Sequence, residues 1–377
     1  MKKYHTFYID PQSYGNLAMY DYNLLKDIHQ DILYIHSNKY DYKSIAGWKE
    51  KPIFSYNNLH NPLIKILSYA VSYIRVFILV LIYRPKNIHI QWFKIPQADY
   101  LYFRVLKKIS RIRLIHTAHN VLPHNTGDKY KNIYHKLYHL CDDIIVHAPI
   151  SKTEIVNLFR ISPDKIHVIP HGLLKINVNQ ELYKEQLPLL QKKYLLDDKI
   201  VFASLGEQSL YKGIDVLAKA WLGTPLLRDN DHLRLLIIGK QNNIDSSTLG
   251  ACKNVIIDNR RISNEEFLFL LRNTDLFLLP YRKISQSGAL LTALTEHVPV
   301  LVNNIGGLAE PLQIANIGWA MNNLSEDNLK NALLNILKDA KILTKIKNDN
   351  ESWKKIEEHY SWKRIGQSTL KLYLLNK

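Results

Sequence analysis

The sequence is poor in cysteine, with only Cys141 and Cys252 among 377 residues. Two widely spaced cysteines form no disulfide framework, and their scarcity is typical of a chain that folds in a reducing compartment. A secretory signal is not predicted either, because the apolar run after Lys3 is short and meets Asp10. Both observations favour a cytoplasmic protein.

Acidic residues are rare in the first half of the chain. Residues 51–113 contain 11 basic side chains and one acid, Asp99, and residues 1–175 carry a net charge of +12 out of +16 for the whole sequence. A surface of one sign attracts polyanions, so nucleic acid and an anionic membrane are the two candidate partners. No helix-turn-helix, zinc-finger or RNA-binding motif accompanies the charge, so we expect a membrane surface and no nucleic acid.

The length and composition indicate a soluble two-domain protein, since 377 residues exceed one ordinary core and 46% of them are apolar. No short repeat or low-complexity tract is present. Strand-like runs alternate with helical ones, which predicts an α/β fold with parallel sheets covered on both faces. The predicted strands are 4–9, 31–36, 87–92, 112–118, 143–148 and 165–170, then 200–206, 233–239, 254–258, 275–280 and 298–302. Between these groups, residues 173–198 read as a linker with helical parts, and helices fill 325–377.

The apolar stretch 63–83 has the length of a membrane span. Lys65 and Arg75 interrupt it, and a charge near the centre of a bilayer is costly. The stretch also stands where a β–α–β crossover helix belongs, so we favour a buried or membrane-facing helix over a true span.

Three loops in the second half carry small residues and a cation at the expected carboxyl ends of strands. They contain Lys212 before Gly213, Ser287 before Gly288, and the pair Gly306–Gly307. Helix N-termini attract phosphate, and glycine lets a ligand approach the backbone. Each loop alone is ordinary turn chemistry, but three in this order predict a diphosphate site.

The ordered motifs "VIPHG" (168–172), "YKGIDVL" (211–217), "DLFLLPYR…SQSGALLTALTEHVPVLVNNIGGLAE" (275–310) and "YSWKRI" (360–365) resemble the family-4 retaining glycosyltransferases of GT-B fold. The resemblance covers most of the chain and is strongest over 199–310. It implies two Rossmann-like doubly wound domains facing a cleft. Residues 1–175 would bind the acceptor, residues 176–355 the nucleotide-sugar, and a last helix at about 356–377 would pack back on the first domain. It also implies a UDP- or GDP-linked donor and no metal or other cofactor.

The same resemblance assigns roles residue by residue. The expected catalytic positions are His119, beside the reacting sugar, and Lys212, on the donor phosphates. The expected donor-binding positions are Gly15, Ser287, Gly288, Ala289, Gly306, Gly307 and Glu310. A histidine at a strand end is also often only structural.

The sequence departs from the family at two places. Glu207, Gln208 and Ser209 stand where relatives have an arginine before the lysine, and Ile284 and Thr292 stand where relatives have two glutamates. The missing cation could come from Arg282, Arg261, Lys283 or Arg260, all of which could equally be solvated surface charges.

His135 and His139, four residues apart near His116, His124 and Cys141, have a spacing that can bind zinc. There is no HExxH motif, so we expect no metal.

The segment 100–113 mixes aromatic and basic residues in a way that suits an anionic membrane, although a solvated helix face has the same composition. We expect Arg104, Lys107, Lys108 and Arg111 to form the membrane and acceptor face. The sequence thus predicts a peripheral enzyme on the inner face of the cytoplasmic membrane. It would move a hexose onto a lipid-linked or polysaccharide acceptor in surface polysaccharide synthesis. A nucleotide-sugar epimerase or hydrolase, and a non-catalytic GT-B partner in an assembly complex, are the alternatives.

Overall fold

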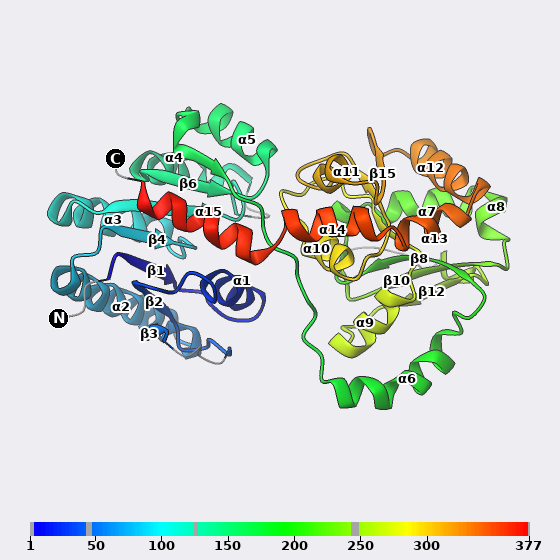
Figure 1. Cartoon of the computed structure of the whole chain (residues 1–377), viewed down its shortest axis with the longest axis horizontal. Coiled ribbons are helices and arrows are strands. Elements are labelled where there is room, and N and C mark those ends of the chain that lie inside the picture. Colours follow the sequence, from blue (N-terminus) through cyan, green and yellow to red (C-terminus); the bar gives the residue numbers. More distant parts are fainter. Residues whose placement is uncertain (1–3, 43–46, 124–126, 243–248, 376–377) are drawn as a thin grey trace. The chain divides into compact units, whose positions relative to one another are not determined.

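The computed structural model describes residues 4–42, 47–123, 127–242 and 249–375, and the chain forms two compact units (Figure 1). Unit 1 contains residues 1–172 together with 360–377, and unit 2 contains residues 173–359. Each unit is a parallel sheet with helices on both faces. The predicted α/β fold with two Rossmann-like units is therefore confirmed.

The sheet of unit 1 has seven strands in the order β3-β2-β1-β4-β5-β6-β7, all parallel. The order reverses between β1 and β4, which makes the carboxyl ends of these two strands a topological switch point. The strands are β1 (Thr6–Asp10), β2 (Ile32–Ser37), β3 (Lys49–Phe54), β4 (Asn87–Ile90), β5 (Arg113–Ala118), β6 (Asp143–Val146) and β7 (Ile166–Val168).

Alternation along the strands of unit 1 supplies two cores, one on each face of the sheet. Phe7 and Ile9 pack against α2, α3 and α4, whereas Tyr8 packs against α1 and α15 on the opposite face. The last helix of the chain, red in Figure 1, thus belongs to unit 1. The helices are α1 (Asn16–Leu25), α2 (Pro62–Tyr83), α3 (Pro96–Ser110), α4 (Lys131–Leu140), α5 (Pro149–Phe159) and α15 (Trp362–Leu374).

Unit 2 has a six-stranded parallel sheet in the order β12-β10-β8-β13-β14-β15, with its switch point between β8 and β13. A further pair of short parallel strands joins the loops after β8 and β10. The strands are β8 (Ile200–Leu205), β9 (Gln208–Ser209), β10 (Leu233–Ile238), β11 (Gln241–Asn242), β12 (Val255–Asp258), β13 (Leu276–Leu279), β14 (Val300–Asn303) and β15 (Gly318–Met321). The helices are α6 (Gln180–Tyr194), α7 (Ile214–Leu222), α8 (Pro225–Arg228), α9 (Asn264–Arg272), α10 (Gly288–Thr295), α11 (Glu310–Ile314), α12 (Glu326–Lys338), α13 (Lys341–Lys347) and α14 (Asn350–His359).

Four strands escaped the sequence analysis for identifiable reasons. β3 and β15 are sheet-edge strands with mostly partly exposed residues, so they lack the apolar run that marks a buried strand. β9 and β11 have two residues each, too few to show an alternation. α6 is the helical part of the predicted linker, and Pro188 in its interior interrupts the helical pattern when the sequence is read alone.

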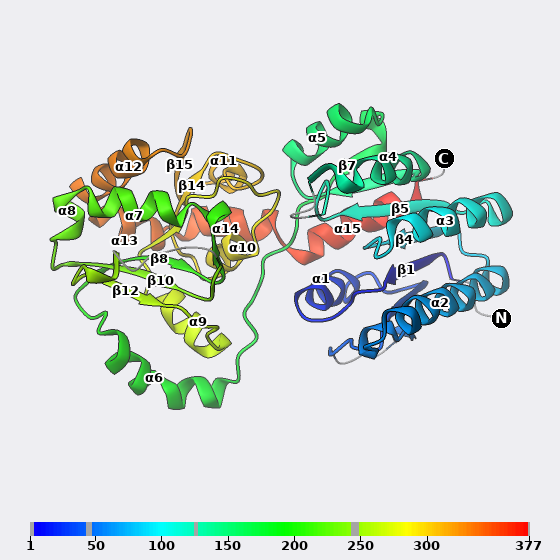
Figure 2. The same cartoon turned by 180° about the vertical axis from the view of Figure 1, so that it is seen from behind.

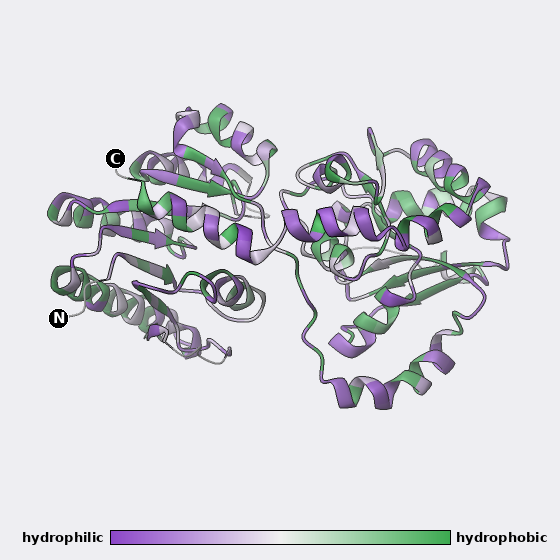
Figure 3. Ribbon diagram, in the orientation of Figure 1, coloured by the Kyte–Doolittle hydropathy of each residue, from purple (hydrophilic) through white to green (hydrophobic). Residues whose placement is uncertain are grey.

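The stretch predicted at 63–83 is α2, which lies beside α3 on one face of the unit 1 sheet (Figure 2). Only a narrow stripe of it is buried, formed by Tyr69, Ser72, Tyr73, Val76 and Val80. Among the residues that the structure describes, α2 is the one helix whose length and composition would suffice to cross a membrane, with a mean hydropathy of 2.0. Its colour in Figure 3 shows this apolar character along most of its length.

Candidate functional site

The loops that follow β8 and β13 meet at the switch point of unit 2 and are held together by glycine contacts. A Cβ on Gly213 would come within 1.9 Å of the Pro280 carbonyl oxygen, and a Cβ on Gly239 equally close to the Gly206 carbonyl oxygen. The backbone N–H of Arg282 donates to the Tyr211 carbonyl at 2.6 Å. Gly213 also has φ +72°, a conformation that favours glycine. The loops after β8, β10 and β13 therefore pack closely against one another and form one layer.

Helix α10 begins in this layer and leaves two backbone N–H groups unused. Ser287 caps it, its Oγ accepting from the N–H of Leu290 at 3.2 Å. Within the described part of the chain, the N–H groups of Gly288 and Ala289 have no hydrogen-bond partner. A helix N-terminus with free N–H groups carries a partial positive charge. Gly288 is exposed, and a Cβ there would be in ordinary van der Waals contact with the Leu174 side chain, at 3.4 Å.

Lys212 is a buried cation in the same layer, with 7% of its surface exposed. Its Nζ lies 5.6 Å from the centre of the Tyr281 ring. Burial lowers the pKa of its ammonium to about 8, and the charge of Glu207 opposes this only in part. No hydrogen bond or ion pair reaches this ammonium from any residue that the structure describes. Because a buried charge is costly without a partner, Lys212 is prepared for an anion.

Tyr281 connects Lys212 to the start of α10. Burial raises the pKa of its phenol, and a hydrogen bond with Ser287 opposes that rise. Its carbonyl accepts from Nδ2 of Asn303, at the end of β14, at 2.8 Å. The loops after β8, β13 and β14 are thus joined through one aromatic residue.

The third predicted loop packs directly on the second. Gly306, at φ +53°, would place a Cβ 2.0 Å from the Ile284 carbonyl oxygen, and the N–H of Gly307 donates to Ser285 at 3.1 Å. Here the glycines serve close backbone packing. Glu310, the first residue of α11, is half-buried, and desolvation raises the pKa of its carboxyl to about 7.

The positions that depart from the family pattern have structural roles of their own. The Gln208 amide is buried and bonds back to Ser204, and the Thr292 hydroxyl donates to the Gly288 carbonyl at 2.9 Å. Among the predicted substitute cations, Arg282 forms a bidentate pair with Asp215, at 2.6 and 2.5 Å. Arg261 is exposed. The prediction that Arg282 and Arg261 bind the donor stays a prediction.

Arg260 and Lys283 were the other two substitute cations. Arg260 pairs with Asp258 and Glu266 in an ion cluster that also includes Lys193. Lys283 is exposed.

In unit 1, His119 follows β5 and lies in a network of aromatic and polar side chains. Its ring stacks on Trp92 with centres 4.7 Å apart and meets Tyr20 edge-on at 4.8 Å. Its Nδ1 lies 3.1 Å from Nε2 of His147, and its Nε2 lies 3.0 Å from Oε1 of Gln91, an amide oxygen that can only accept. Burial, and then the neighbouring histidines, lower the pKa of His119 well below its usual range, so the ring is neutral at pH 7.

The neighbours of His119 contact both of its ring nitrogens. Nδ1 of His147 lies 3.0 Å from the Ile169 carbonyl and must carry a proton to donate to it. Burial lowers the pKa of His147 to about 4, so its Nε2 is an acceptor at pH 7. Both His147 Nε2 and Gln91 Oε1 therefore offer an acceptor to the one N–H of the neutral His119 ring. The sequence analysis missed His147, Gln91, Trp92 and Tyr20. The first three stand in or just beyond the predicted strands 87–92 and 143–148, which flank the strand before His119.

Gly15 ends the loop after β1 and is the N-cap of α1, with φ +58°. Nothing lies within 4 Å of its Cβ position, so its backbone faces open space. It belongs to unit 1, as does His119, whereas the other predicted donor-binding residues belong to unit 2.

Three of the four basic residues predicted to form a membrane face at α3 are exposed to solvent. Arg104, Lys108 and Arg111 are exposed, whereas Lys107 donates to Asp142 at 2.6 Å and to the Leu140 carbonyl at 2.8 Å. Three exposed apolar side chains lie among these basic ones, namely Leu101, Val105 and Ile109.

The predicted histidine cluster has ordinary local contacts. His135 and His139 stack on each other on α4, at 4.2 Å, and Cys141 is buried with the pKa of its thiol raised by desolvation. His124 lies outside the described residues. Within 4–42, 47–123, 127–242 and 249–375, no three His, Cys, Asp or Glu residues are grouped to hold a metal ion.

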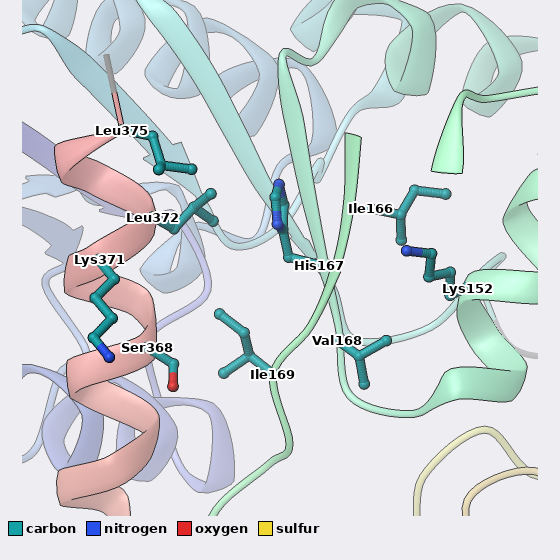
Figure 4. A pocket seen from close by; sticks show the side chains of 9 residues that line it. All are labelled: Lys152, Ile166, His167, Val168, Ile169, Ser368, Lys371, Leu372 and Leu375. Carbon is teal, nitrogen blue, oxygen red and sulfur yellow. The ribbon is translucent and has the colours of Figure 1, made fainter. Parts of the chain in front are cut away.

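A pocket of about 500 Å³ lies between β7 and α15 (Figure 4). Its walls are the side chains of His167 and Val168 from β7 and of Ile169 just after it, together with those of Leu372 from α15 and Leu375 just beyond that helix. Nε2 of His167 forms a hydrogen bond with Oδ1 of the buried Asp143, at 2.7 Å. The pocket is at a sheet edge rather than at the carboxyl ends of strands, and it contains none of the predicted site residues.

Two family models match the chain. Residues 45–173 match the model described as Glycosyltransferase Family 4, and residues 197–339 match the one described as Glycosyl transferases group 1. No curated protein sequence matches this chain.

Several solved structures share the fold over nearly the whole chain. Sucrose-phosphate synthase from Thermosynechococcus elongatus is 15% identical with a TM-score of 0.71, covering 99% of this chain and 98% of its own. HepE from Anabaena, in complex with UDP, is 13% identical with a TM-score of 0.70, covering 98% and 99%. WaaG, a glycosyltransferase involved in lipopolysaccharide biosynthesis, is 14% identical with a TM-score of 0.62, covering 98% and 100%. At these identities the likeness concerns the fold.

Proposed function

The chain belongs to the family-4 glycosyltransferases of GT-B fold, and on this premise we propose which transfer it performs. The donor is a nucleoside-diphosphate hexose, and the acceptor is a lipid-linked or polysaccharide hydroxyl in the synthesis of a surface glycan. The enzyme works on the cytoplasmic face of the membrane.

The observation that carries the donor assignment is the buried Lys212 ammonium, which has no hydrogen-bond or ion-pair partner among the described residues and lies in the layer where α10 begins. A diphosphate supplies the anion that this ammonium lacks, and its oxygens accept from the free N–H groups of Gly288 and Ala289. HepE is described in complexes with UDP and with UDP-glucose, which supports a uridine donor as the first to test.

In the proposed reaction, the acceptor oxygen forms a bond to the anomeric carbon as the bond from that carbon to the diphosphate oxygen breaks. The nucleoside diphosphate leaves with both electrons of that bond, and the acceptor hydroxyl loses its proton. Lys212 and α10 stabilise the charge that develops on the leaving diphosphate. Since these groups supply positive charge, we propose that no metal is needed, and EDTA should leave the rate unchanged.

Within this proposal, the neutral His119 acts near the anomeric carbon. Its neutral ring forms a hydrogen bond with a sugar hydroxyl rather than removing a proton as a strong base. The retaining stereochemistry is a proposal that follows from the family. An NMR assay of the product anomer tests it, and an inverted product would refute it.

Nucleotide binding to the full chain tests the donor assignment. UDP or GDP at one hundred times its Kd should stabilise the protein by about 2.7 kcal/mol. Lys212→Ala should abolish most of this stabilisation, whereas Lys219→Ala, an exposed lysine on α7, should leave it intact.

A second candidate function is that of a non-catalytic GT-B partner in an assembly complex. The observation that favours it is the absence of carboxylates at Ile284 and Thr292. A wild-type protein that no nucleoside diphosphate stabilises, and that Lys212→Ala does not alter, would overturn the transferase proposal in its favour.

We also propose that α2 and α3 hold unit 1 against an anionic membrane. Large apolar side chains of both helices face outward beside the exposed Arg104, Lys108 and Arg111. A single-signed basic rim around an apolar face suits interfacial insertion. The exposed apolar residues are Leu63, Ile64, Ile66, Leu67, Val71, Ile74, Ile78, Leu81 and Ile82 of α2, and Leu101, Val105 and Ile109 of α3.

Co-sedimentation with phosphatidylglycerol vesicles at low salt tests this proposal. We expect strong binding that high salt weakens only in part, because the apolar contribution is not screened. Failure to bind at low salt would refute it.

A further inference from the structure

Unit 1 has a basic pocket at its own switch point. Four loops line it, and they follow β3, β2, β1 and β4, which are neighbours in the sheet. Since all four strands are parallel, their carboxyl ends meet at one edge. The pocket has a volume of about 460 Å³ and is lined, among others, by Tyr14, Asn57 and the first turns of α2. It is large enough for a phosphorylated head group.

Three lysines from three different segments converge on this pocket. Lys39 follows β2, Lys65 lies in the second turn of α2, and Lys94 follows β4. The one hydrogen bond of the Lys94 ammonium to a described residue is to the Gln12 side-chain carbonyl, at 3.0 Å. None of the three ammonium groups forms an ion pair with any residue that the structure describes. No aspartate or glutamate is among the described residues that line the pocket.

Lys65 and Lys94 repel one another in the absence of an anion. Partial desolvation, followed by the charge of Lys65, lowers the pKa of Lys94. Two acidic groups whose charges act on Tyr56 of the pocket are engaged inside the fold, where Asp99 accepts from the Tyr69 hydroxyl at 2.8 Å and Asp10 accepts from the Gln12 N–H at 2.7 Å. Neither carboxyl lines the pocket.

The pocket is apolar at one end. Ile66 lines it and is 55% exposed, and it is continuous along α2 with the exposed apolar face described above. The backbone N–H groups at the start of α2 do not contribute to anion binding, because the Asn61 side chain already accepts from the N–H groups of Leu63 and Ile64. An ammonium cluster next to an apolar helix face matches a ligand with an anionic head and a hydrocarbon tail.

We propose that this pocket binds the diphosphate of a lipid-linked acceptor, with the three lysines on the phosphates and the first part of the lipid along Ile66 and the outer face of α2. This inference rests on the proposed function and deepens it, because it names the acceptor class as an isoprenoid-type lipid diphosphate. A saccharide attached to that diphosphate would present the hydroxyl that receives the sugar.

Calorimetry with farnesyl diphosphate, a soluble lipid diphosphate, tests the pocket in the full chain. We expect binding in which Lys39→Ala, Lys65→Ala and Lys94→Ala each weaken the affinity about tenfold, as for a charged hydrogen bond. Lys136→Ala removes an exposed lysine on α4 and should change nothing. Ile66→Ser should weaken the binding of farnesyl diphosphate but not the binding of inorganic pyrophosphate.

Other ligands distinguish the sources of the phosphate. Pyrophosphate that binds as tightly as farnesyl diphosphate would overturn the lipid assignment, and so would displacement of farnesyl diphosphate by phosphatidylglycerol vesicles alone. Unchanged farnesyl diphosphate binding in the triple lysine variant would overturn the site itself.

UDP stabilisation is measured on the same variants. It should persist in all of them, because Lys212 and the start of α10, to which the donor phosphates are assigned, lie in unit 2. If UDP binds and farnesyl diphosphate does not, the acceptor inference fails alone. If neither binds, the proposed function fails as well.

Discussion

At the residue scale, Lys212 has the properties of a group retained for binding rather than for stability. Its ammonium is almost fully buried and has no anionic partner among the described residues. Its charged form is therefore disfavoured in the folded protein, where its pKa is about 8 instead of 10.5. The folded state pays this penalty at every pH below about 8, and the penalty disappears as pH rises toward 10.5.

Lys212→Met should stabilise the ligand-free protein. At pH 7 the gain in the free energy of unfolding is up to about 3 kcal/mol, from a pKa difference of about two and a half units. The gain should vanish near pH 10.5. Thermal melts from pH 7 to 10.5 check this, and a variant that is destabilised at pH 7 would show that the lysine has an intramolecular partner.

The affinity for UDP should depend on pH through the same group. Binding requires the ammonium, so the affinity is constant below about pH 8 and falls as pH rises above it. Titration calorimetry from pH 6.5 to 9.5 measures the slope. Lys212→Met should bind weakly and without this slope, and a wild-type affinity that rises above pH 8 would contradict the assignment.

His147 is predicted to be a positioning residue for His119. His119→Leu should lower kcat about 100-fold, as expected for the loss of one polar contact in the transition state. His147→Leu should lower kcat about tenfold by removing one of the two polar contacts that orient the His119 ring, with little change in donor KM. His135→Leu, on the exposed side of α4, is the matched control. If His147→Leu raised the donor KM by the same factor by which it lowered kcat, the result would point to unfolding of the side-chain network instead.

At the element scale, α2 differs from an ordinary crossover helix in how little of its apolar surface faces the core. Its buried stripe follows the spacing of three and four residues that packs a helix on a sheet. The remaining surface would normally be polar, but it is apolar here. An exposed apolar surface of this extent marks a protein or membrane contact.

Leu67→Glu combined with Ile74→Glu should weaken binding to phosphatidylglycerol vesicles by at least about tenfold, since each buried aliphatic side chain is worth about 1.5–3 kcal/mol. The folded protein should keep its stability, because both positions are more than half exposed. Leu226→Glu, an exposed leucine of α8 in unit 2, should not affect vesicle binding. Equal losses in the two variants would indicate an effect of net charge alone.

At the scale of the whole molecule, the two units have different ligands in this proposal. The excess positive charge belongs to residues 1–175, and the unpaired donor lysine belongs to unit 2. This division assigns the amphiphilic acceptor to unit 1 and the phosphates of the donor chiefly to unit 2.

Hydrogen exchange of the intact protein should separate these ligands. UDP should protect the loops at 206–213 and 280–290, whereas farnesyl diphosphate should protect the loops after β1, β2 and β4. Protection of the same segments by both ligands would refute separate sites.

The sequence by itself determined the two α/β units, because alternating apolar strands and helices specify a parallel sheet through local periodicity. It also placed Lys212, Ser287 and Gly288 in loops after strands, because β–loop–α turns put such residues at strand ends, and their role in donor binding stays a prediction. The tertiary structure alone decided which side chains remain without partners. Arg282 forms an ion pair with Asp215 and Lys107 forms one with Asp142, whereas Lys212 has no ion-pair partner among the described residues. It also brought Lys39, Lys65 and Lys94 together from three segments, because the order of strands in a sheet is set by packing over the whole unit and not by neighbours in the chain.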